Sequence, residues 1–129
     1  MSKILPKYPI FIPSHKRSDV CLTPRLFMEH GVPFKLVVDE TEYEKYEKIF
    51  GTERMLLLPF LNDGTSAPPR SWITDYSRKQ GDHRHWQIDD NIRWFCHFNG
   101  RTRIQIQPNL GLRLCEEFCD QWNNVGIYG

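Results

Sequence analysis

Short apolar runs alternate with stretches of helical character along the first two-thirds of this 129-residue chain. Each run is only four to six residues long and is bounded by charged residues, glycine or proline, which is the length and setting of a buried strand. Strands that alternate with helices are typical of parallel βαβ units, whose helices cover both faces of the sheet. We therefore predict an α/β fold with a three-layer α/β/α arrangement and a mostly parallel sheet. The predicted strands are the apolar runs 8–13, 34–38 and 55–58, together with the more polar stretch 83–88.

Local capping signals place helices between these strands. Thr23 followed by Pro24 predicts a helix start with proline at the first helical position. Thr41, with Glu44 three residues later, has the pattern of a capping box and predicts a second helix start. Glycines follow the ends of the helical stretches, as expected for helix termination. The predicted helices are residues 25–30, 41–50 and 70–79.

The remainder of the chain predicts a hairpin and a last helix. Residues 92–98 are rich in β-forming side chains, and Asn99-Gly100 is a hairpin-type turn before a second alternating stretch at 103–106. Residues 110–122 predict an amphipathic helix. We treat residues 1–129 as one domain with a core over 8–98, followed by the hairpin and helix over 99–129. The apolar stripe of that helix is Leu110, Leu114, Phe118 and Trp122.

The overall charge and the apolar content narrow the class of protein. Seventeen basic and sixteen acidic residues leave a net charge of +1, so no global field favours nucleic acid, although a local basic patch remains open. No apolar run approaches the roughly 20 residues of a membrane span, and the N-terminus has no signal-peptide pattern. We therefore expect a cytoplasmic protein without a membrane partner. Cys115 and Cys119 lack a second ligand pair for zinc, so we expect reduced core thiols.

Open parallel sheets bind ligands at the carboxyl ends of their strands. In this chain those positions hold residues 14–17, Asp39, the loop that ends at Arg70, and Asp89 to Asn91. Arg17 and Arg70 are suited to phosphate oxygens. A carboxylate at Asp39 can accept from a ribose hydroxyl or a base edge. These residue types favour a nucleotide as the ligand.

Asp89, Asp90 and Asn91 follow the fourth predicted strand directly. Two adjacent carboxylates repel each other unless a cation offsets them, and Mg²⁺ or Mn²⁺ prefers such oxygen ligands together with phosphates. A solvated turn after a strand has the same composition. Both interpretations stand at this point.

Four blocks of sequence occur in the order seen in one protein family. They are Tyr-Pro-Ile-Phe-Ile-Pro-Ser-His-Lys-Arg (8–17), Leu-Val-Val-Asp (36–39), Pro-Pro-Arg-Ser-Trp (68–72) and Gly-Asp-His-Arg-His-Trp-Gln-Ile-Asp-Asp-Asn-Ile (81–92). In these blocks the chain resembles the TET-associated glycosyltransferases of bacteriophages, enzymes of the GT-A class. The resemblance implies a Rossmann-like, nucleotide-sugar-binding fold. It also implies sugar transfer from a nucleotide-sugar, with a UDP-sugar expected, to hydroxymethylated pyrimidines in phage DNA.

The resemblance also implies a set of site residues. Pro13, Ser14, Arg17 and Asp39 would line the nucleoside pocket, and Arg70 would approach the ribose and diphosphate. Asp89, Asp90 and Asn91 would correspond to the Asp-x-Asp motif that binds Mn²⁺ or Mg²⁺. Because strand alternation aims Asp89 and Asn91 one way and Asp90 the other, one of the carboxylates is expected at the ribose instead of the metal.

Members of the family are expected to be about twice this long and to continue into an acceptor-binding half. We therefore expect donor binding with weak transfer by this chain alone, and stronger activity with a partner chain or after self-association.

Two other functions fit parts of the sequence. His83 and His85 are two apart on a predicted strand and could share a metal with Asp89 in a hydrolase. Alternatively, the second half could serve as a non-catalytic module that binds nucleic acid or protein, because arginines alternate there with aromatic rings. Those residues are Arg93, Trp94, Phe95, Phe98, Arg101, Arg103 and Arg113.

Overall fold

A computed structural model describes residues 3–127 and contains a four-stranded sheet in which every strand is parallel to its neighbours. Its order is β3 (Met55–Leu57), β2 (Lys35–Val38), β1 (Ile10–Pro13) and β4 (Trp86–Gln87). The chain therefore starts in the middle of the sheet, moves to one edge and then returns to the other side of β1. The predicted α/β fold with a parallel sheet is confirmed.

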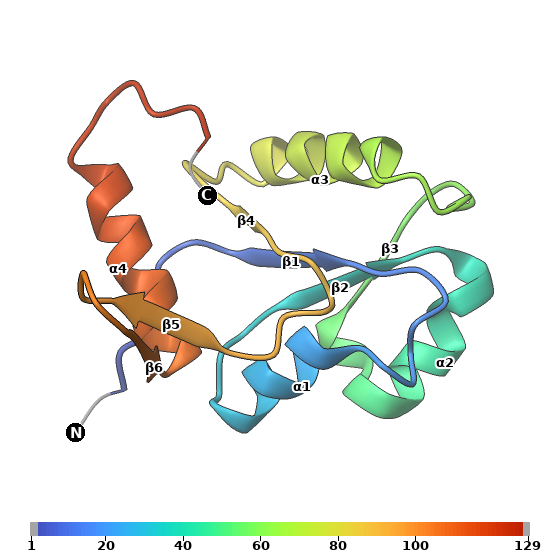
Figure 1. The fold of residues 1–129 in the computed structure, drawn as a ribbon. Helices are drawn as coiled ribbons and strands as arrows, with labels where there is room; N and C mark the ends of the chain where they lie inside the picture. The colour runs from blue at the N-terminus through green and yellow to red at the C-terminus, as the bar shows by residue number, and fades with distance from the viewer. Residues whose placement is uncertain (1–2, 128–129) are drawn as a thin grey trace.

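Helices cover both faces of this sheet (Figure 1). The helix α3 (Ala67–Lys79) lies on one face, where Ile73 packs with Phe11 and Val37. The helices α1 (Leu22–Glu29) and α2 (Glu40–Phe50) lie on the other face over the larger core cluster. Alternate residues of β1 and β2 enter the two clusters, because successive side chains of a strand point to opposite faces.

The observed elements begin and end at different residues from those predicted. Helix α1 begins at Leu22, because its first amides donate to the carbonyl oxygen of Asp90 (Leu22 N–O 2.8 Å). Asp39, and not Thr41, caps α2 by accepting from the amides of Thr41 and Glu42. Helix α3 begins at Ala67, so part of the predicted loop is its first turn. A 3-10 turn, η1 (Thr52–Arg54), precedes β3, and β4 is shorter than the predicted 83–88.

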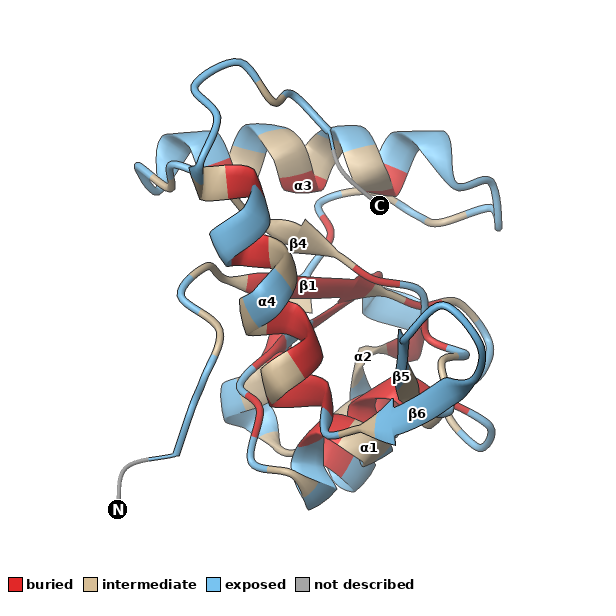
Figure 2. Ribbon diagram, turned by 60° about the vertical axis from the view of Figure 1, so that its left-hand side comes forward, coloured by how far each residue is buried: buried red, intermediate tan, exposed pale blue. Residues whose placement is uncertain are grey.

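A separate antiparallel hairpin follows the sheet. It consists of β5 (Phe95–Phe98) and β6 (Arg103–Ile106), joined across the predicted Asn99-Gly100 turn. Only Phe95 and Ile106 of these strands are half-buried, and the other residues are exposed (Figure 2). The predicted strand over 92–98 begins three residues later, since the Ile92 amide donates to the Thr23 hydroxyl instead of entering a sheet.

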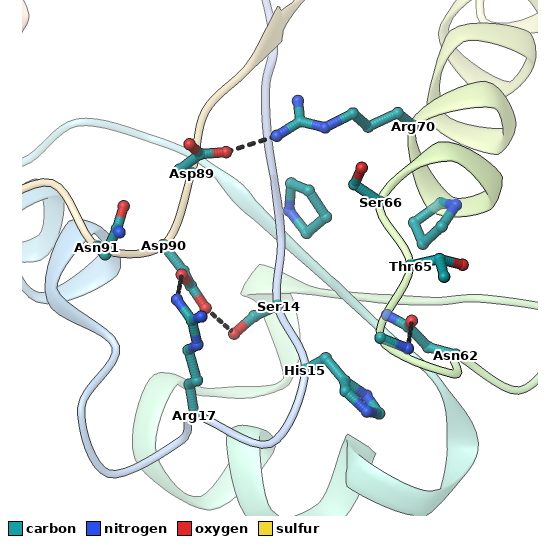
Figure 3. A pocket seen from close by; sticks show the side chains of 13 residues that line it. Ser14, His15, Arg17, Asn62, Thr65, Ser66, Arg70, Asp89, Asp90 and Asn91 are labelled. Atoms are coloured by element: carbon teal, nitrogen blue, oxygen red, sulfur yellow. Dashed lines mark hydrogen bonds and ion pairs between the residues drawn. The ribbon is translucent and has the colours of Figure 1, made fainter.

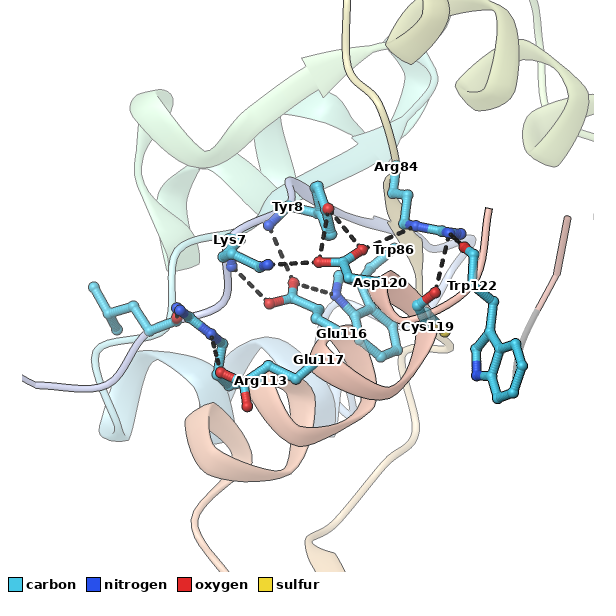
Figure 4. Close-up of polar contacts among 11 residues, drawn as sticks. Lys7, Tyr8, Arg84, Trp86, Arg113, Glu116, Glu117, Cys119, Asp120 and Trp122 are labelled. Carbon is cyan, nitrogen blue, oxygen red and sulfur yellow. Dashed lines mark hydrogen bonds and ion pairs between the residues drawn. The ribbon is translucent and has the colours of Figure 1, made fainter. Parts of the chain in front are cut away.

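The helix α4 (Pro108–Asp120) buries a different face from the predicted one. Leu112, Glu116 and Cys119 are buried, whereas most of the predicted stripe (Leu114, Phe118 and Trp122) is about half exposed. The cause is polar: the Glu116 carboxylate accepts from the amides of Lys7 and Tyr8 and from the indole of Trp86 (Figure 4). Contacts with the N-terminal segment and with β4 therefore decide how this helix rotates about its axis.

The neighbouring carboxylate on α4 completes this attachment. Asp120 pairs with Lys7 and Arg84, and the Tyr8 hydroxyl donates to it at 2.8 Å (Figure 4). Arg84 also donates to carbonyl oxygens at the end of α4 and beyond it. The last helix is thus tied to the chain just before β1 and just before β4.

Within residues 3–127 no helix is long and apolar enough to cross a membrane.

Candidate functional site

A pocket of about 360 Å³ lies at the carboxyl ends of β1 and β4 (Figure 3). Three segments form its walls: the loop after β1, the loop and first turn that lead into α3, and the residues after β4. It brings together seven of the eight residues predicted for the nucleotide and metal site and adds six others. The lining residues are Pro13, Ser14, His15, Arg17, Asn62, Gly64, Thr65, Ser66, Pro69, Arg70, Asp89, Asp90 and Asn91.

The loop after β1 is held in place by a tyrosine of α2. The buried Tyr46 hydroxyl is 2.6 Å from Ser14 Oγ and accepts from the Arg17 amide at 3.0 Å. Between them Lys16 has φ 55°, a left-handed conformation that residues other than glycine rarely adopt. This turn directs Arg17 back across the loop. Burial raises the pKa of Tyr46 to about 12, although the hydrogen bonds with Ser14 and Arg17 oppose the increase.

Asp90 lies in the wall of the pocket, but its side chain is buried and binds other protein groups. Only 8% of its side chain is exposed, and both carboxylate oxygens have partners. Ser14 Oγ donates to Oδ2 at 2.6 Å, and Arg17 Nη1 donates to Oδ1 at 3.1 Å (Figure 3). Its backbone oxygen accepts from the first amides of α1. Asp90 therefore joins the loop after β1, the start of α1 and the end of β4.

Asp89 faces solvent at the mouth of the pocket. Its side chain is 62% exposed, and Oδ1 lies 2.5 Å from Nη2 of Arg70 (Figure 3). Arg70 comes from the first turns of α3, where the helix dipole is positive and favours anions. Asn91 is also exposed and lines the same pocket. One carboxylate, one amide and one guanidinium therefore surround the opening.

Asp39 does not line this pocket, which departs from the implied role at the nucleoside. The residue is 2% exposed, and its carboxylate is used within the protein: Oδ1 caps α2, and Oδ2 accepts from the Asn62 amide at 2.7 Å. Burial alone would raise the pKa of Asp39, but the hydrogen bonds from Thr41, Asn62 and Glu42 lower it below the ordinary value. The residue acts on the pocket through Asn62, whose loop it anchors.

Three of the four sequence blocks, 8–17, 68–72 and 81–92, meet in space at this pocket, and Asp39 of the fourth anchors the Asn62 loop. A model of the TET-associated glycosyltransferase family matches residues 8–129, which is nearly the whole chain. The chain belongs to the TET-associated glycosyltransferase family. This membership implies a function related to glycosyl transfer. Searches of curated proteins and of solved structures found no significant match.

The pocket of this TET-associated glycosyltransferase includes residues that sequence reasoning did not single out. His15 lies against the loop of Asn62 and Gly64, where a Cβ added at Gly64 would be 3.5 Å from the His15 ring. The Nδ1 atom of His15 is buried and has no partner among the described residues. The sequence held one indication of these residues, because the Asn62 loop directly follows the third predicted strand. The order of the strands in the sheet then decides which of the strand-end loops meet.

A divalent metal ion could take only part of its ligands from the pocket residues of this family member. Among residues 3–127, no group of three or more histidines, cysteines, aspartates and glutamates could hold a metal ion. Asp90 is engaged on both oxygens, but Asp89 and Asn91 present oxygen atoms at the pocket mouth. Mg²⁺ typically takes one or two carboxylates and completes its coordination with ligand phosphates and water. The donor set thus fits an ion shared with a diphosphate and does not fit an all-protein cage.

The alternative prediction of a hydrolase, with a metal site formed by His83, His85 and Asp89, is wrong. The histidines precede β4 and Asp89 follows it. Four residues of extended chain span roughly 13 Å, so His85 and Asp89 lie toward opposite ends of the strand. His85 instead packs edge-on against Phe11 and bonds with Gln87, and burial lowers its pKa.

Proposed function

We propose that this protein binds a nucleotide-sugar, with a UDP-sugar as the expected donor, and transfers the sugar to hydroxymethylated pyrimidines in DNA. One observation carries the donor half of this proposal. Arg17, Arg70 and Asp89 belong to a single pocket at the carboxyl ends of parallel strands, in a chain of a glycosyltransferase family. The acceptor half rests on the family resemblance.

The diphosphate is assigned to the opening between Arg70 and Arg17. Guanidinium groups bind phosphate oxygens through paired hydrogen bonds, and the N-terminal turn of α3 adds its partial positive charge. Asp89 now neutralises Arg70. A phosphate that displaced this carboxylate from Arg70 would leave Asp89 free for a cation, so anion and cation binding are expected to support each other.

We assign the divalent cation, Mn²⁺ or Mg²⁺, to Asp89 and Asn91 together with the donor's phosphates. The ion would supply positive charge that stabilises the departing diphosphate. Asp90 is removed from the proposed metal ligands, because its oxygens hold Ser14 and Arg17. Its proposed role is to position Arg17 at the pocket.

The nucleoside is assigned to the side of the pocket formed by Pro13, Ser14, His15 and the loop from Asn62 to Thr65. The Nδ1 atom of His15 has no partner within residues 3–127, and a base or ribose could satisfy it. Asp39 would contribute by keeping the Asn62 loop in place.

Calorimetry tests the donor site directly. UDP should bind in the presence of Mn²⁺, and EDTA should abolish most of the affinity. Asp89→Ala should have the same effect as EDTA, whereas the matched control Asp75→Ala, an exposed carboxylate paired with an arginine on α3, should bind normally. Metal-independent affinity, or unchanged binding by Asp89→Ala, would contradict the assignment.

Transfer is tested by incubating the protein with a UDP-sugar, Mn²⁺ and hydroxymethylcytosine DNA, followed by mass spectrometry of the nucleosides. We expect weak transfer by the monomer and stronger transfer after self-association or with a partner chain, because both substrates must be positioned for reaction. Efficient transfer by demonstrably monomeric protein would overturn that expectation. Donor binding without any transfer under all conditions would limit the function to donor binding.

A further inference from the structure

The hairpin presents cationic and aromatic side chains together on an exposed part of the molecule. The residues Arg93, Trp94, Phe98, Arg101 and Arg103 are all exposed, and we call them the hairpin surface. Trp94 is 54% and Phe98 is 65% exposed, which is unusual for such large rings. Figure 2 shows β5, β6 and their connection almost entirely as exposed chain. The donor pocket uses none of these residues.

The arginines of the hairpin surface differ from the other arginines of the chain. The chain has ten arginines, and seven of them bond through their guanidinium groups to a carboxylate or a carbonyl oxygen. The guanidinium groups of the other three bond to no residue within 3–127. Those three are Arg93, Arg101 and Arg103.

The charge of this segment is also unbalanced. Residues 91–107 contain these three arginines and no aspartate or glutamate, so the segment carries +3 with histidine neutral. The whole chain carries +1, which leaves −2 for all the remaining residues. The positive charge of the chain is therefore concentrated on the hairpin, although the net charge of the whole chain is close to zero.

The strand register places a ring beside a cation. Phe98 lies directly opposite Arg103 in the antiparallel pair, so their side chains share one face of the hairpin. Cys96 and Gln105 form the next pair on that face and add no charge. Arg101 lies in the connection beside this pair, and Arg93 and Trp94 directly precede β5. One end of the surface therefore has Arg93 beside Trp94, and the end at the connection has Arg103 opposite Phe98.

These features favour one class of partner. A second copy of the chain bound symmetrically through this surface would bring three more unpaired arginines against the first three, which costs energy. A polyanion would neutralise them. The exposed rings favour a single strand over a duplex, because only unstacked bases offer their faces to aromatic side chains.

We propose that the hairpin surface binds single-stranded nucleic acid, with the arginines on the phosphates and Trp94 and Phe98 stacked on bases. Along the chain this surface begins two residues after Asn91, the last residue of the pocket wall. The proposal goes beyond the proposed sugar transfer, because it requires neither a donor nor a metal ion.

Fluorescence anisotropy with a labelled 20-nucleotide oligothymidylate tests the proposal, without nucleotide-sugar or divalent metal. Each phosphate contact on a single strand contributes about 0.7 to the slope of log affinity against log salt, so three arginines predict a slope of about −2. Arg101→Ala/Arg103→Ala should reduce that slope by about 1.4. Trp94→Ala/Phe98→Ala should weaken binding by about tenfold or more and leave the slope unchanged.

The matched control is Arg78→Ala/Lys79→Ala, which removes the same charge from an exposed position on α3 and should bind like the unmodified protein. Binding by the arginine variant equal to that of the control would overturn the proposal. So would tighter binding of a duplex of the same length, or a dimer in gel filtration that the hairpin substitutions dissociate. Circular dichroism would confirm that each variant remains folded, as expected for exposed positions.

Calorimetry with UDP and Mn²⁺ on the same variants separates this proposal from the proposed function. Hairpin variants that lose the oligonucleotide but still bind UDP would support a separate nucleic-acid surface. If the unmodified protein failed to bind UDP, the proposed donor site would be contradicted, but the proposed nucleic-acid surface would not.

Discussion

Asp89 and Asp90 are adjacent in the chain, yet 62% of the Asp89 side chain and only 8% of the Asp90 side chain is exposed. Asp89 meets Arg70 at the pocket mouth, while Asp90 is enclosed by Ser14 and Arg17. Neighbouring residues in extended chain point to opposite sides, so one carboxylate is available to a ligand and the other binds the protein. This division separates the proposed ligand-binding role from a positioning role.

Substitution of the two carboxylates should therefore have different effects, on ligand binding for Asp89 and on stability for Asp90. Asp89→Ala removes an exposed ion pair and should change the free energy of unfolding by less than about 1 kcal/mol, while abolishing Mn²⁺-dependent UDP binding. Asp90→Ala leaves the Ser14 hydroxyl and Arg17 without their buried acceptor and should cost about 2–3 kcal/mol. Urea unfolding and calorimetry measure both quantities. The reverse pattern would assign the metal to Asp90.

Asp39→Ala should destabilise the protein and alter its pH dependence. The lost helix cap costs about 1 kcal/mol, and the lost bond to Asn62 costs about as much again. Because the folded protein lowers the pKa of Asp39, its ionised form stabilises the fold above about pH 4, and this stabilisation is lost as the pH falls through the lowered pKa. The stability difference between the two proteins should therefore shrink in acid.

Thermal or urea unfolding between pH 6 and pH 2 tests this behaviour. The control Glu44→Ala removes an exposed carboxylate from the same helix and should shift stability by a few tenths of a kcal/mol. An Asp39→Ala difference that stays constant down to pH 2 would show that the carboxylate charge is not involved.

Tyr46→Phe should loosen the loop after β1. The hydroxyl bonds with Ser14 and with the Arg17 amide, so its removal should cost about 1–3 kcal/mol and weaken UDP binding through Arg17. Burial raises the pKa of this tyrosine to about 12, so the neutral hydroxyl stabilises the fold below about pH 10 and that contribution is lost as the pH rises toward 12. The variant should lack this alkaline decline.

The matched control for this substitution is Tyr43→Phe on the same helix, whose hydroxyl bonds to no residue within 3–127. From pH 8 to pH 11 the stability of the control should be nearly the same as that of the unmodified protein, alkaline decline included. Equal losses in both variants would indicate that the Tyr46 hydroxyl does not hold the loop.

Glu116→Gln should weaken the attachment of α4. The carboxylate accepts three N–H groups with its two oxygens, and an amide can replace only one of those oxygens as an acceptor. We expect a loss of about 2 kcal/mol and faster hydrogen exchange at the Lys7 and Tyr8 amides. Glu117→Gln, whose side chain is exposed and paired within the helix, should change stability by less than about 0.5 kcal/mol. Similar effects of the two substitutions would mean that the buried carboxylate does not orient the helix.

The sequence by itself determined the order of strands and helices, because those signals are local. Apolar runs, caps and terminating glycines act between residues a few positions apart, so they predict βα units and the strand ends where Arg17, Arg70 and Asp89 were expected. The family resemblance added the prediction that the ligand is a nucleotide-sugar. These predictions needed no knowledge of which distant segments meet.

Only the tertiary structure decided what each polar side chain does at the site. Asp90 is bonded to Ser14, 76 residues away, and Asp39 to Asn62, 23 residues away, and neither partner is apparent from local pattern. The same holds for Glu116, whose partners lie 109 and 108 residues earlier and reverse the expected face of α4. Burial of a charge depends on partners brought by long-range packing, because an unpaired buried charge is too costly to persist. Hence a sequence can list the carboxylates near a site, but the fold selects which one a ligand can reach.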